Sequence, residues 1–104
     1  MTKPFSAKQI LLLKNGAKAM RSINHDLRMS IITLLRQKKH MDVTSIYVDL
    51  RLEQSVASQH LAILRKENVV KTEREGKNIF YSVNEKRVME ILNCCEALKN
   101  PNID

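Results

Sequence analysis

One change in the spacing of apolar residues, near Val69, restricts the fold more than any other feature of the chain. Before it, apolar side chains recur every three or four residues, as they do on the buried face of an α-helix. Over 69–83 they form two short runs rich in β-branched and aromatic residues, which predicts two strands. Gly76 lies between the runs and predicts a turn, and after Asn84 the helical spacing returns.

The expected order is therefore four helices, one hairpin and one helix. The first helix is predicted over about 6–21, and the second begins after an N-cap at Asn24 and ends at about Lys39. The other helices are predicted over about 43–50, 54–67 and 84–99, and the two strands over about 69–74 and 79–83. Ser6 and Gln9 form a capping box at the first helix, and Pro101 ends the last one. Two short helices joined by a three-residue turn and followed by a basic hairpin indicate a winged helix-turn-helix fold.

Length and charge limit the kind of partner. A chain of 104 residues is one domain, 1–104, with 43% hydrophobic residues, which excludes wholesale disorder. It carries 18 Lys and Arg against 11 Asp and Glu, a net charge of +7, which favours a polyanionic partner. No apolar run exceeds four residues, as at Ile10 to Leu13, which is far shorter than the roughly 20 residues of a membrane span, so no membrane partner is expected.

Other features indicate a cytoplasmic protein without a cofactor. No apolar signal-peptide region follows Met1, and the two adjacent cysteines, Cys94 and Cys95, do not form a disulfide framework. No nucleophile–base pair, paired carboxylate set or glycine-rich phosphate loop is visible, so an enzyme is not expected. His25, His40 and His60 do not have the spacing of metal ligands.

The fourth predicted helix has the side chains of a DNA recognition helix. Ala57, Leu61 and Leu64 would form its buried face. Amide and hydroxyl groups that can bond base edges occupy the other face, at Gln54, Ser55, Ser58 and Gln59. His60 and Arg65 would reach the DNA backbone. A solvent-exposed surface helix is the alternative, although such a face more often carries Glu and Lys.

The predicted hairpin is basic near its tip. Arg74, Lys77 and Asn78 would contact flanking phosphates or the minor groove. The alternative is an edge hairpin kept soluble by its lysines.

Three segments resemble the ArsR family of dimeric bacterial winged-helix repressors. They are Leu27–Leu35, an Arg followed by an Ile/Leu-rich stretch; Ser55–Arg65, a Ser followed by polar residues and a later Leu-Arg; and Val69–Val83, the wing. Together the resemblance covers about 24–99, in the family's order.

The resemblance implies a homodimer that represses transcription by binding a near-palindromic operator in double-stranded DNA. The terminal helices, about 6–21 and 84–99, would form the dimer interface and place the two recognition helices one DNA turn apart, roughly 34 Å. Their apolar stripes supply the interface residues Leu11, Leu12, Ala17, Val88, Ile91, Leu92 and Cys95. The alternative is that these stripes pack on each other within one chain.

The chain departs from the family pattern at several positions. Arg51 replaces the usual turn glycine, and Glu53 replaces the usual Ser or Thr cap. The family's metal sites are not expected, because the matching positions are Asp42 and Thr44 in one site and Glu85, Arg87, Leu98 and Pro101 in the other.

The two cysteines allow two interpretations. Cys95 falls in the apolar stripe of the last helix, where a cysteine usually acts as a small buried hydrophobe. Some family members use cysteines in this helix for trivalent arsenic or thiol oxidation, so thiol sensing by Cys94 or Cys95 is the functional alternative. No inducer follows from the sequence.

Two functions of different classes remain. The first is a sequence-specific transcriptional regulator. The second is a winged-helix protein-interaction module whose basic face meets an acidic protein, which predicts no specific DNA binding.

Overall fold

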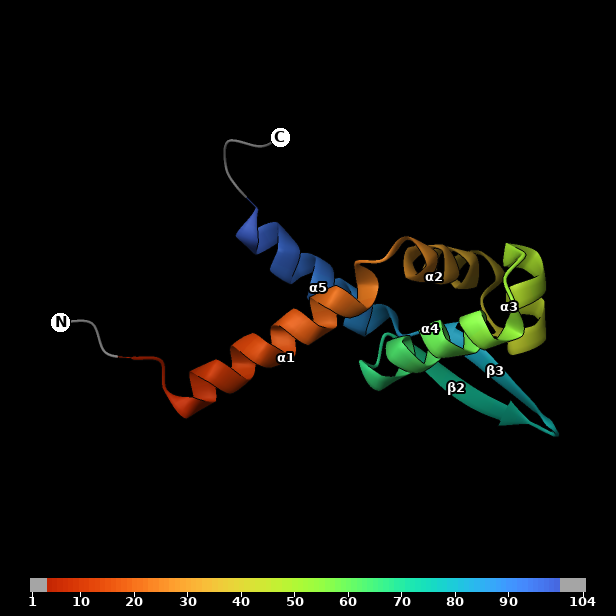
Figure 1. Cartoon of the computed structure of the whole chain (residues 1–104), viewed down its shortest axis with the longest axis horizontal. Coiled ribbons are helices and arrows are strands. Elements are labelled where there is room, and N and C mark those ends of the chain that lie inside the picture. Colours follow the sequence, from red (N-terminus) through yellow and green to blue (C-terminus); the bar gives the residue numbers. More distant parts are fainter. Residues whose placement is uncertain (1–3, 100–104) are drawn as a thin grey trace.

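The computed structural model describes residues 4–99, which form five helices and a three-stranded antiparallel sheet (Figure 1). The elements are α1 (Ala7–Ile23), α2 (Asp26–Lys38), β1 (Met41–Asp42), α3 (Val43–Leu50), α4 (Gln54–Lys66), β2 (Val70–Glu75), β3 (Asn78–Val83) and α5 (Glu85–Leu98). The order confirms the prediction of four helices, a hairpin and a final helix. Pro101, expected to end the last helix, lies outside the described residues.

The core lies where α2, α3, α4 and the sheet meet. Its largest fully buried side chains are Ile31, Leu35, Ile46, Leu61, Leu64 and Val69. Helical spacing predicted Ala57, Leu61 and Leu64 as the buried face of α4, and all three are at most 1% exposed. The helix is thereby held against the core along its whole length, which leaves the opposite face outward.

The sheet contains one strand that the sequence did not predict. Its order is β1-β3-β2, with Met41 opposite Tyr81 and Asp42 opposite Phe80. A strand of two residues is too short to show an alternating pattern. Asp42 is also the N-cap of α3, since its carboxylate accepts the Ser45 N–H at 2.8 Å. This hydrogen bond, together with one from the Ser45 hydroxyl, holds the pKa of Asp42 below its usual value.

The hairpin turn forms as predicted around Gly76. Glu75 pairs with Asn78, so Gly76 and Lys77 are the only two residues of the loop. Gly76 has φ +63°, a conformation that glycine adopts without steric cost. Asn78, expected in the turn, is the first residue of β3.

The boundary between α1 and α2 differs from the prediction. Asn24, expected to cap α2, instead ends α1, where its backbone N–H bonds the Met20 carbonyl. His25 caps α2, with its Nδ1 accepting the Leu27 N–H at 3.1 Å. Asparagine is favoured at both ends of helices, so its residue type alone could not decide between them. The capping box of Ser6 and Gln9 at α1 is confirmed.

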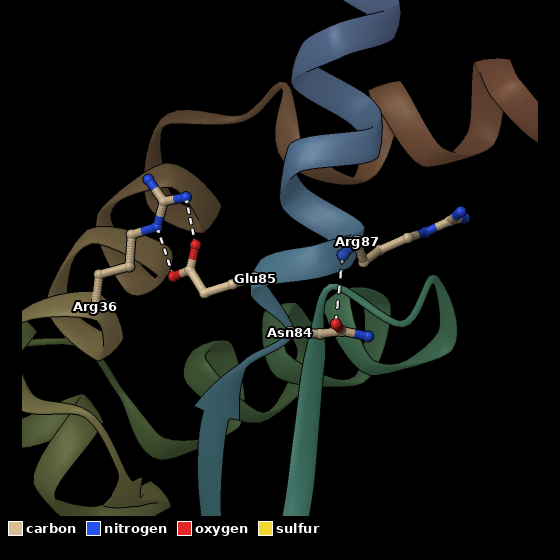
Figure 2. A network of polar contacts seen from close by, with 4 residues as sticks. All are labelled: Arg36, Asn84, Glu85 and Arg87. Atoms are coloured by element: carbon tan, nitrogen blue, oxygen red, sulfur yellow. Dashed lines mark hydrogen bonds and ion pairs between the residues drawn. The ribbon is translucent and has the colours of Figure 1, made fainter.

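Polar contacts fix the first turn of α5 to the rest of the molecule (Figure 2). Arg36 of α2 makes a bidentate pair with Glu85, at 3.0 and 2.8 Å, and Asn84 caps α5 by accepting the Arg87 N–H. Arg87 Nε also donates to the Glu67 carbonyl at the end of α4. A half-exposed ion pair contributes roughly 0–1 kcal/mol, so these contacts set the direction of α5 more than its stability.

The outer halves of the terminal helices project from the body on the side away from the hairpin tip (Figure 1). Their large apolar side chains are between 42% and 71% exposed: Ile10, Leu11, Leu12, Leu13, Leu92 and Leu98. Packing of the two stripes within one chain is therefore wrong for these residues. Only the inner turns are buried, through Ala19 and Ser22 in α1 and Val88 and Ile91 in α5.

The expectation that Cys95 is a buried hydrophobe is also wrong for the single chain. Both Cys94 and Cys95 are free and exposed. Cys95 lies beyond Ile91, the last buried residue of α5, where the helix has left the core.

The turn between α3 and α4 contains a left-handed residue that is not glycine. Arg51 has φ 55° and ψ 42°, and its N–H bonds the carbonyls that end α3. A side chain with a Cβ in this conformation costs on the order of 1 kcal/mol. The expected substitution of Arg for the family's glycine therefore keeps the turn geometry at a cost in stability.

We predict that Arg51→Gly raises the free energy of unfolding by about 0.5–1 kcal/mol, because glycine removes the Cβ strain. Urea denaturation followed by circular dichroism measures the change. Arg51→Ala is the matched control, since it removes the guanidinium but keeps the Cβ. An equal gain in both variants would assign the cost to the arginine side chain and contradict the prediction.

Candidate nucleic-acid interface

The outward face of α4 follows from its buried one. At about 100° per residue, one row of side chains lies directly opposite Ala57, Leu61 and Leu64. This row is exposed and consists of Ser55, Gln59, Ala62 and Lys66. Its side chains are short near the N-terminal end and cationic at the C-terminal end, so the helix can approach a groove closely and meet a phosphate at its far end.

One flank of α4 faces the wing, which is the β2–β3 hairpin. Ser58 and Arg65 are exposed on this flank and line an open groove of about 410 Å³ whose other wall includes Tyr81 of β3. Gln54, the first residue of α4, is exposed near the same flank. Two of the four predicted base-reading residues, Gln54 and Ser58, thus lie between the outward row and the wing, and the other two, Ser55 and Gln59, lie in the row itself.

The other flank of α4 faces α1 and α2. His60 is half-buried there, with its ring centroid 4.7 Å from that of His25 and its Nδ1 3.3 Å from the Arg28 guanidinium. Because Arg28 can only donate, His60 Nδ1 accepts in this contact. The predicted backbone residue His60 therefore points toward α2, away from the outward row, and braces α4 against it.

This environment lowers the pKa of His60. The largest cause is burial, followed by the positive charges of His25 and Arg28. A proton on His60 would also block the acceptor that Arg28 uses. The contact between α2 and α4 is thus formed by the neutral imidazole.

The wing carries the predicted cations at its end. Lys77 is exposed in the two-residue loop, and Arg74 is exposed on β2 with its Nε 3.4 Å from the Gly76 carbonyl. Asn78 is exposed at the start of β3. These side chains lie at the far end of the hairpin, where it extends from the body beside α4 (Figure 1).

Sequence reasoning missed Ala62 and Lys66 as members of the outward row. Their signal was present, because Ser55, Gln59, Ala62 and Lys66 follow the helical spacing i, i+4, i+7 and i+11. An alanine has no group that hydrogen-bonds a base, but its small size suits close approach to a groove and its methyl group is of a kind that can pack against a thymine methyl.

Residues at the family's metal positions are engaged in other contacts. Asp42 caps α3, and Glu85 pairs with Arg36. Within residues 4–99, no three His, Cys, Asp or Glu side chains are grouped so that they could hold a metal ion. Over the same residues, no helix has the length and apolar character needed to cross a bilayer.

The fold and this face define a winged helix-turn-helix protein, with α3 and α4 as the helix-turn-helix and the β2–β3 hairpin as the wing. Residues 25–72 match the family model for bacterial regulatory proteins of the arsR family. The transcriptional repressor PagR of Bacillus anthracis is 34% identical over 84 residues, which cover 81% of this chain and 84% of PagR. The chain belongs to the arsR family of DNA-binding transcriptional regulators.

Solved structures agree with this fold. NolR from Sinorhizobium fredii is 30% identical, with a TM-score of 0.76 over 93% of this chain and 96% of that one. The winged helix-turn-helix DNA-binding domain Mb0332 from Mycobacterium bovis, described as homodimeric, has a TM-score of 0.76 at 20% identity, over 99% of this chain and 94% of its own. The second likeness concerns the fold alone.

We predict that stability falls as the pH drops below about 6.5, in part through His60. Because folding lowers the pKa of His60, the unfolded chain binds the proton more readily than the folded protein does. The contribution of His60 to stability is therefore fully present above its pKa in the unfolded chain, and it is lost as the pH falls from that value toward the lower pKa of the folded protein. His60→Gln should flatten this dependence in urea titrations between about pH 7.5 and pH 5. Gln37→Ala, on an exposed residue of α2 that does not titrate, is the control and should keep the wild-type slope. Equal slopes in wild type and His60→Gln would show that His60 does not contribute.

Proposed function

We propose that this protein is a cytoplasmic transcriptional repressor that binds a near-palindromic operator as a homodimer. The observation that carries the proposal is the exposed face of α4, with its short polar row backed by Ala57, Leu61 and Leu64. The net charge of +7 suits a DNA partner, and the similarity to PagR supports repression.

Four residues of α4 would read base edges: Gln54, Ser55, Ser58 and Gln59. Gln59 lies in the outward row, where its amide can pair with adenine in the major groove. The serines are short enough to bond bases or phosphates without holding the helix away from the groove floor. Arg65, Arg74, Lys77 and Asn78 would bind the phosphate backbone on the wing side, while the structure supports a bracing role for His60 instead.

Dimerisation would cover the apolar outer halves of α1 and α5. The predicted interface residues Leu11, Leu12 and Leu92 are between 48% and 61% exposed in the single chain. Large apolar side chains exposed in this number on two helices are typical of a protein interface. Val88 and Ile91, also predicted there, are buried within the chain, so they would hold α5 in place and would not contact the partner directly. Ala17 is half-buried and Cys95 exposed, and both remain interface predictions.

We predict that Ser58→Ala and Gln59→Ala each lower the preference for operator over unrelated duplex by about 1–3 kcal/mol per protomer, because each removes one base contact from each half-site. For the dimer this is on the order of 30-fold to 10⁴-fold. Selection of genomic fragments by the purified protein supplies the operator, and gel-shift titration measures both affinities. Gln37→Ala, on an exposed glutamine of α2, is the matched control and should bind as wild type.

The same titration separates the two functions. Unchanged operator affinity in the Ser58/Gln59 double variant would show that α4 does not read bases. Wild-type protein that selects no fragment and binds duplexes without preference would favour the protein-interaction module.

We predict that Leu12→Asp breaks the dimer without unfolding the chain. Leu12 is 61% exposed, so the substitution removes little contact within one chain. Each Leu loses about 1.5–3 kcal/mol of apolar burial and a dimer has two, so the dissociation constant should rise on the order of 10²–10⁴-fold. Sedimentation equilibrium measures it. Thr44→Asp, at an exposed residue of α3, is the control and should dimerise as wild type does. This interface would be refuted if the wild-type protein were a monomer, or if Leu12→Asp dimerised with the wild-type dissociation constant.

A further inference from the structure

A basic groove lies on the flank of α4 opposite the wing, and none of the predicted DNA contacts uses it. The groove is open, has a volume of about 290 Å³, and is walled by α1, α2 and α4. Four cations line it, Lys18, Arg21, Arg28 and Lys66, against a single acid, Glu67.

The cations on α1 form a stripe. Lys14, Lys18 and Arg21 follow at i, i+4 and i+7, so they share one face of the helix. All three are exposed, and within residues 4–99 none of them forms an ion pair. Like charges in adjacent turns destabilise an isolated helix by a few tenths of a kcal/mol, so the stripe does not stabilise α1.

Arg28 sets the geometry of the groove. Its guanidinium donates to the Ser22 carbonyl at 2.7 Å and the Arg21 carbonyl at 3.2 Å, and it lies 3.3 Å from His60 of α4. One side chain therefore joins the end of α1 to α4. It also occupies carbonyls at the negative end of α1, which would otherwise face an incoming anion.

The groove is continuous with the proposed DNA face. Lys66, the last residue of α4 and part of its outward row, lines both this groove and the groove beside the wing. Ile63, which is 41% exposed, occupies the α4 wall between Lys66 and the bracing residue His60. The outward row is thus bordered by positive charge on both sides.

A helix in the major groove has a sugar-phosphate strand on each side of it. The wing can meet only one of the two. We propose that the groove between α1 and α4 receives the other strand, with Lys18, Arg21 and Lys66 binding its phosphates. This inference rests on the proposed function. It gives α1 two roles, DNA binding at its inner end and dimerisation at its outer half.

The test is the salt dependence of binding to the selected operator and to one unrelated duplex. Each lost phosphate contact makes the slope of log Kobs against log[salt] shallower by about 0.9, so a substitution present twice in a dimer changes it by about 2. We expect Lys18→Ala and Arg21→Ala to weaken binding to both duplexes equally and to flatten the slope by this amount. Lys77→Ala, on the wing, should do the same.

Lys86→Ala is the matched control. Lys86 is an exposed lysine on α5 that, within the described part of the chain, forms no ion pair and lines neither groove. Sedimentation equilibrium on each variant confirms that the dimer is intact. Lys18→Gln and Arg21→Gln keep the helix and the side-chain length, and they replace the alanine variants if those fail to fold.

The outcomes distinguish this inference from the function on which it rests. Suppose that wild-type binding is salt-dependent and that Lys77→Ala flattens the slope, while Lys18→Ala and Arg21→Ala keep the wild-type slope. The groove then does not bind the DNA backbone, and the inference is overturned. If inorganic phosphate, added at fixed ionic strength, binds the groove without lowering the affinity for DNA, the groove takes a free anion instead of the DNA backbone, and the inference is also overturned. If wild type itself shows no salt-dependent duplex binding, the proposed function fails first.

Discussion

The packing of Ala57, Leu61 and Leu64 against the core determines the rotation of α4 about its own axis, and the rest of the candidate interface depends on that rotation. With these three side chains at most 1% exposed, Ser55, Gln59 and Lys66 must face outward. A rotation by one residue, about 100°, would turn Gln59 toward a flank and leave a leucine in water. The apolar face of the helix therefore selects which polar side chains a duplex would meet.

Periodicity predicted most of the fold from the sequence, because the helices and hairpin strands are long enough to show it. All five helices and both hairpin strands were expected within a few residues of their observed bounds. The same reasoning could not find β1, whose two residues have no period. It also misplaced the cap of α2, because Asn24 suits the end of one helix as well as the start of the next.

Within the candidate interface, position on the helix was a better guide than residue type. The amide and hydroxyl groups of α4 were expected outward and are exposed. His60 was assigned to the backbone by its chemistry, yet its contact with Arg28 comes from α2, which is distant in the chain and invisible to local spacing. The basic groove has the same origin, since Lys18 and Lys66 belong to helices that only the tertiary fold brings together.

The two roles of Asp42 have a consequence for how the domain moves and how its length can vary. Its backbone pairs with Phe80 in the sheet, and its carboxylate begins α3. No spare residue separates the wing from the helix-turn-helix, so a hinge cannot form between them without breaking a strand pair or a cap. The two parts should tilt together as one rigid unit. Insertions are expected to accumulate in relatives at the hairpin tip or the chain ends, and to avoid this junction.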